Sequence, residues 1–147
     1  MSLTYKIALF FHLLGATVWV GGHLLLALRY LPLALKNKEV SILRTFEHQY
    51  ETIGIPALFV QILSGLWMAF GHFGLSFMSF STPLQRVVSV KLLFLFFTFV
   101  LAIHARFFII PRLTPEKLPL MGFHIVAVTL IGVCMLFLGL LFRMGGL

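Results

Sequence analysis

The chain has 147 residues; 61% of them are hydrophobic, 10% are charged, and the mean hydropathy is +1.07. This composition predicts an integral membrane protein, and the length predicts a single domain over residues 1–147. The net charge of +7 comes from Lys and Arg at the ends of hydrophobic stretches. We interpret these cations as topology anchors and lipid-headgroup contacts, and we predict no nucleic-acid partner. A single cysteine, Cys134, excludes an intrachain disulfide and a CxxC motif.

Four apolar stretches predict four membrane-spanning helices, and their short links predict an all-α, up-down-up-down bundle in the lipid bilayer. Pro32 is expected to end the first helix near Tyr30. Apolar residues at helical spacing predict an amphipathic interfacial helix over residues 33–51, and Pro56 is expected in the first turn of the next helix. The expected spans are residues 6–29, 52–73, 86–110 and 118–143.

The first stretch carries polar residues along one face. His12 and His23 are eleven residues apart, so they lie about 20° apart around a helix. Trp19 falls between them, and small residues flank the same stripe. Because imidazole is costly in hydrocarbon, this face is expected to point into the bundle. The small residues Gly15, Ala16 and Gly22 would let a neighbouring helix or a flat cofactor come close.

The other histidines divide by depth. His23, His104 and His124 are expected in one layer, roughly 7–10 Å from the bilayer centre. His12, His72 and the third helix's Lys91 are expected in the opposite half. Since helices 1 and 3 are diagonal in such a bundle, His23 and His104 could hold a b-type haem between them.

This haem hypothesis assigns roles to other residues. His12 is the alternative anchor of a second or different site. The candidate cofactor walls are Trp19, Leu93 and Phe97, and the candidate propionate partners are Arg29, Arg106 and Arg112. The candidate metal ligands are His12, His23, His72, His104 and His124.

Three readings remain open at the sequence level. The first is a haem protein that transfers electrons, as a membrane oxidoreductase. The second is a copper carrier that binds a copper ion through the same histidines, although the six Met are scattered and copper(I) favours sulfur. The third is a bundle without a cofactor, because a lone intramembrane histidine often only hydrogen-bonds between helices.

Two stretches also carry a family likeness. FHLLGATVWVGGHLLLALRYLP and KLLFLFFTFVLAIHARFFIIPRL resemble helices 1 and 3 of the CopD-type copper-resistance membrane domain. That resemblance implies a role in copper resistance or copper uptake across the inner membrane. A more distant resemblance, through Phe11-His12 and Lys91-Leu92, is to the HemJ-type protoporphyrinogen oxidases, which are four-helix haem proteins. It implies that His12 is a haem ligand and that Lys91 is its functional partner.

Charge predicts an orientation as well. The side with the links between helices 1 and 2 and between helices 3 and 4 carries more Lys and Arg than the side with both termini. The positive-inside rule therefore predicts periplasmic termini in a bacterial inner membrane. The sequence leaves open the redox partner, the copper donor or acceptor, and whether the chain forms a homodimer.

Overall fold

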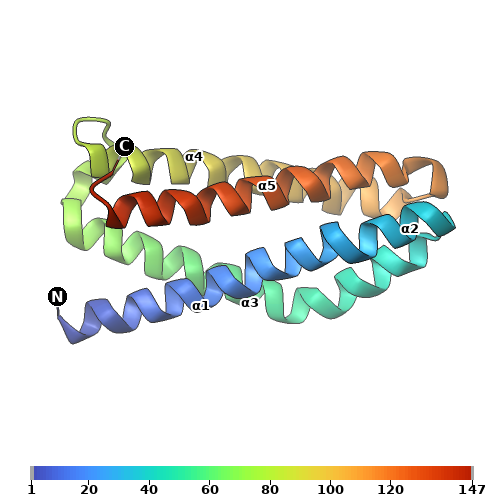
Figure 1. Ribbon diagram of the computed structural model, residues 1–147, viewed down its shortest axis with the longest axis horizontal. Coiled ribbons are helices and arrows are strands. Elements are labelled where there is room, and N and C mark those ends of the chain that lie inside the picture. The colour runs from blue at the N-terminus through green and yellow to red at the C-terminus, as the bar shows by residue number, and fades with distance from the viewer. Residues whose placement is uncertain (1, 147) are drawn as a thin grey trace.

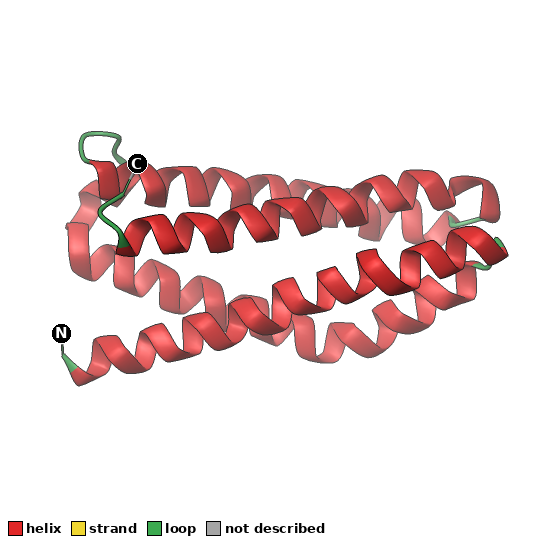
Figure 2. Ribbon diagram, viewed as in Figure 1, coloured by secondary structure: helices red, strands yellow, loops and turns green. Residues whose placement is uncertain are grey.

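The computed structural model describes residues 2–146, and these residues form an all-α bundle of four long helical segments, as the sequence predicted. Figure 2 shows that only short loops separate the helices. All four segments are long and apolar enough to cross a membrane, so the chain is a multi-pass membrane protein. The segments are Leu3–Asn37, Val40–Met78, Pro83–Arg112 and Pro115–Arg143.

The main helices within these segments are α1 (Leu3–Leu25), α2 (Leu31–Asn37), α3 (Val40–Phe73), α4 (Pro83–His104) and α5 (Leu118–Arg143). In Figure 1, α1 runs beside α3 and α4 runs beside α5, with both termini at one end of the bundle. The closest packing joins α1 to α3, α4 to α5 and α1 to α5. This order makes α1 and α4 diagonal, as the bundle topology predicts.

The first helix does not end at Pro32, which corrects the sequence prediction. A π-helical turn, Leu26–Tyr30, joins α1 to α2, and the N–H of Leu31 bonds to the carbonyl of Leu26. Proline has no N–H and its ring crowds the preceding turn. A wider π turn relieves this crowding, so the helix continues to Asn37 and ends at Lys38 in a left-handed conformation. The third span also contains a π-helical turn, Ala105–Ile109, but it ends directly after Pro111, in the 3₁₀ turn Ile110–Arg112.

The structure divides the segment expected as one interfacial helix, residues 33–51, between two helices. Its first residues belong to α2, and the rest form the first three turns of α3. Apolar residues of this segment contact neighbouring helices: Leu43 is 2% exposed, and the Phe46 ring lies 4.6 Å from that of Tyr30. Pro56 consequently lies well inside α3 and not in its first turn.

The two ends of the bundle are packed differently. The buried core lies at the end with α2 and the link between α4 and α5. Arg44 strengthens this end by donating hydrogen bonds to the carbonyls of Ile110 and Leu113. The opposite half holds the cavity described below. The core residues are Leu26, Leu31, Ala34, Leu43, Ala105, Ile109, Leu113, Leu118, Met121 and Ile125.

Candidate functional site

All four long helices line a cavity of about 420 Å³ in the half of the bundle that holds the termini. Its walls are mainly apolar, and a few polar or charged side chains interrupt them. His12 and Trp19 come from α1, Gln61 and His72 from α3, and Lys91 from α4. The residues that the sequence predicted for this half of the bundle, including His12 and Lys91, therefore line one cavity.

A hydrogen bond fixes the orientation of the His12 ring. Its Nδ1 lies 2.7 Å from the main-chain carbonyl oxygen of Gln61, on the facing helix α3. A carbonyl only accepts hydrogen bonds, so Nδ1 carries the proton and Nε2 keeps its lone pair. The ring also packs on Gly65, where a Cβ atom would lie 2.8 Å from His12 Cε1. His12 is thus held in the tautomer that can bind a metal through Nε2.

The side chain of Gln61 is a further polar feature of the cavity. Its side chain is 9% exposed, and its Oε1 atom is the one buried side-chain oxygen without a hydrogen-bond partner among residues 2–146. Gln61 lines the cavity, and its main-chain carbonyl bonds to His12. Nothing in the sequence indicates that the main-chain carbonyl of Gln61 orients His12.

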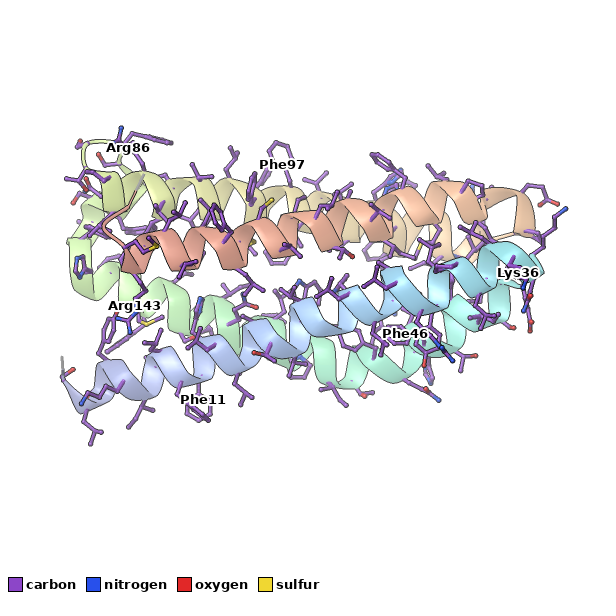
Figure 3. The ribbon with its side chains drawn as sticks, in the orientation of Figure 1. Phe11, Lys36, Phe46, Arg86, Phe97 and Arg143 are labelled. Carbon is purple, nitrogen blue, oxygen red and sulfur yellow. The ribbon has the colours of Figure 1, made fainter. Side chains whose placement is uncertain are left out.

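The cations of the cavity are Lys91 and Arg143. Lys91 reaches from α4 toward α5, with its Nζ 3.6 Å from the position of a Cβ atom on Gly139. Arg143, at the end of α5, lines the cavity mouth with Tyr5 and His72. Figure 3 shows Arg143 reaching from α5 toward α1. None of the described lining residues is Asp or Glu, so the cavity favours an anionic group.

His23 has neighbours outside this cavity. Its Nδ1 lies 2.9 Å from the Trp19 carbonyl, and its ring lies 4.4 Å from the Trp19 ring. The Tyr50 ring is 5.9 Å away, and the Tyr50 hydroxyl donates to the carbonyls of Val18 and Trp19. His23 belongs to this aromatic cluster between α1 and α3.

His104 contacts His124 instead of a diagonal partner on α1. Its Nδ1 lies 2.8 Å from Nε2 of His124. Arg106, two residues further on, pairs with Glu51 at 2.6 Å. The structure therefore brings two of the three predicted imidazoles of this layer together, and gives His23 different neighbours.

Other predicted cofactor contacts face away from the bundle. Leu93 is 50% exposed and Phe97 is 46% exposed, and Figure 3 shows Phe97 pointing outward. The small residues of α1 make room for α3: a Cβ on Gly15 would lie 2.6 Å from the Ala57 carbonyl, and one on Gly22 would overlap the Tyr50 ring. Close helix packing, and not a cofactor, occupies this part of the small-residue stripe.

The fold and the cavity define a four-helix membrane protein with an internal cavity between its helices. The family model for copper resistance protein D matches residues 44–142, and the chain belongs to this copper-resistance family. No curated protein and no solved structure matches the chain.

Proposed function

We propose that the protein binds b-type haem in the four-helix cavity, with His12 as the axial ligand, and acts as a redox protein of the copper-resistance family. The observation that carries the proposal is the His12 ring, anchored through Nδ1 and lining the cavity with its Nε2 lone pair intact. Metal-binding histidines typically donate their other N–H to a carbonyl or carboxylate in this way. The sequence-based choice of His23 and His104 is replaced by His12.

Cavity size supports a flat organic cofactor. Small-molecule pockets are typically about 300–1,000 Å³ and mostly apolar, and the 420 Å³ cavity lies in that range. A metal ion without porphyrin takes all its ligands from the chain, whereas porphyrin supplies four nitrogens, so a single histidine at one of the two axial positions can anchor the iron. Among residues 2–146, no group of three or more His, Cys, Asp or Glu could hold an ion.

Charge supports the same cofactor. Haem b carries two propionates, and Lys91 and Arg143 would hold them without a competing carboxylate in the described lining. A copper cation beside the same two residues would be repelled in a low-dielectric cavity. The walls that would enclose the macrocycle include Leu9, Trp19, Leu58, Leu92 and Leu136. Bound haem would supply one-electron redox chemistry, and the polar residues would fix its position.

The second candidate function is copper binding in the same cavity. Met68 from α3 and Met135 from α5 line it together with His12, although the methionines are scattered in sequence. Thioether and imidazole ligands suit copper(I), and the family match favours a copper-related role. The HemJ-like oxidase activity stays a prediction that shares His12 and Lys91 with the haem proposal.

The test is the visible spectrum and metal content of the full chain, purified in detergent after expression with haem and copper supplied. A Soret band with a sharp α band after reduction, at about one haem per chain, is the expected result. Stoichiometric copper without these bands would favour copper binding in the cavity over haem binding. Neither cofactor in a folded sample would refute both.

We also propose that both termini are periplasmic in a bacterial inner membrane. The cations at the core end, including Lys36, Lys38 and Arg112, support this orientation. Reporter fusions at the C-terminus test it: alkaline phosphatase is expected to be active there and green fluorescent protein dark. The reverse pattern would invert the topology.

A further inference from the structure

Helices α1 and α5 pack together along only part of their length. From the core end to the middle of the bundle they are in contact: the Thr129 hydroxyl lies 3.2 Å from the His23 carbonyl oxygen, and a Cβ atom on Gly132 would lie 3.2 Å from Val20 Cγ2. Toward the termini, no hydrogen bond joins described residues of the two helices, and Figure 1 shows their ribbons diverging. Val20 and Gly132 mark the last of these close contacts.

Beyond that point, apolar side chains of the two helices border an open side of the cavity. Leu13 lies about 20° from Val20 around α1, and Leu136 lies about 40° from Gly132 around α5, so both point toward the other helix. The exposed fractions are 54% for Leu13, 44% for Leu136 and 55% for Leu140, and all three leucines line the cavity. Side chains packed against a neighbouring helix would be covered, so these leucines form a groove, which we call the α1–α5 groove.

A polar pocket of about 340 Å³ lies at the terminal end of this groove, lined by Ser2, Tyr5, His72, Phe142 and Arg143. The Ser2 Oγ accepts a hydrogen bond from the Tyr5 amide at 3.2 Å, so the hydroxyl proton remains free to donate. The structure gives the Tyr5 hydroxyl and the Arg143 guanidinium no hydrogen-bond partner among residues 2–146. None of the described lining residues is Asp or Glu, so the pocket offers several donors that suit the oxygens of a phosphate group.

We propose that an anionic phospholipid binds here, with its phosphate among Ser2, Tyr5 and Arg143 and one acyl chain along the α1–α5 groove. The dimensions fit, because α5 rises about 16 Å from Gly132 to Arg143 and the hydrocarbon of one leaflet is about 15 Å thick. The acyl chain therefore reaches from the bilayer centre to the headgroup level, where cationic side chains attract anionic lipids. A free phosphate would fill only the polar pocket and leave the leucines of the groove uncovered.

This lipid site adjoins the cofactor cavity but does not depend on the cofactor. Tyr5, Phe142 and Arg143 line both the polar pocket and the cavity, so a bound acyl chain would form the side wall that α1 and α5 leave open. The Arg143 guanidinium carries five N–H donors, which is enough for a phosphate and a haem propionate at once. Lipid binding therefore needs no haem, and either proposal can fail while the other stands.

The test is native mass spectrometry of the full chain in detergent, titrated with phosphatidylglycerol or with phosphatidylcholine of the same acyl chains. One phosphatidylglycerol is expected to bind each chain more tightly than phosphatidylcholine does. Arg143→Gln is expected to weaken this binding at least about tenfold, because hydrogen bonds between two charged groups are lost, and Tyr5→Phe is expected to weaken it less. Lys6→Gln is the matched control, because Lys6 is an exposed cation at the same end of α1 that lines neither the polar pocket nor the cavity.

A photoactivatable acyl chain locates the bound lipid. Phosphatidylglycerol that carries one is expected to label the peptides that contain Leu13 and Leu136. Equal affinity for the two lipids, an equal loss in Lys6→Gln, displacement of the lipid by inorganic phosphate, or labelling of other helix faces alone would each overturn the site. Loss of haem in His12→Ala with the lipid retained would support a lipid site that needs no haem. Arg143 is exposed, so the Arg143→Gln variant is expected to fold, and circular dichroism checks this.

Discussion

Gly65→Ala tests whether the anchored His12 ring is the cofactor ligand without removing any ligand atom. The new Cβ would lie 2.8 Å from His12 Cε1 and 3.1 Å from Nδ1, whereas ordinary contacts begin at 3.4 Å. The ring must therefore move by about 0.6 Å, which strains or breaks its 2.7 Å hydrogen bond to the Gln61 carbonyl. Losing such an orienting bond typically lowers metal affinity about 10–100-fold, or about 1.4–2.7 kcal/mol.

The assay is titration of haem-depleted protein with haem, followed at the Soret band. Gly71→Ala is the matched control, because no atom lies within 4 Å of its Cβ position on the same helix. We expect Gly65→Ala to bind haem at least about tenfold more weakly and Gly71→Ala to bind as wild type does. Equal affinities for Gly65→Ala and wild type would refute the role of the His12–Gln61 contact.

Three further predictions concern stability, measured as the free energy of unfolding in mixed micelles. Gly22→Ala places a Cβ 2.2 Å from the Tyr50 ring and is expected to lower the free energy of unfolding by about 1–3 kcal/mol. Gly21→Ala is the control, because its Cβ would lie in open space and cause no overpacking. Equal losses in the two variants would contradict this packing. Tyr50→Phe removes the hydroxyl that bonds to two carbonyls of α1 and is expected to cost about 0.5–1.5 kcal/mol; an unchanged stability would count against those bonds. Arg106→Gln breaks a half-exposed ion pair with Glu51 and is expected to cost under about 1 kcal/mol; a larger loss would mean that the pair is shielded from solvent.

Hydropathy was sufficient to predict the four-helix membrane bundle, because each span must satisfy its backbone hydrogen bonds internally. The break at Pro32 was mispredicted, since a π turn can carry a helix past proline and leaves no signal in residue type. The division of residues 33–51 between α2 and α3 was not predicted either. An amphipathic period looks the same whether its apolar face meets lipid or, as at Leu43, a neighbouring helix.

The candidate site was only partly readable from sequence. Angular position put His12 and Trp19 on one inward face, and both line the cavity. Depth suggested that His104 and His124 lie in one layer, and their rings are in contact. Which helices are neighbours decides the rest, because the pairing of His104 with His124 depends on α4 packing against α5, and residue spacing within one helix does not contain that information.

The most direct test of the central claim is a comparison of reduced-minus-oxidised spectra of wild type, His12→Ala and the His23→Ala/His104→Ala double variant. The account predicts that His12→Ala loses the haem bands while the double variant retains them. Haem bands that survive in His12→Ala and disappear in the double variant would contradict the account and restore the diagonal pair as the haem ligands.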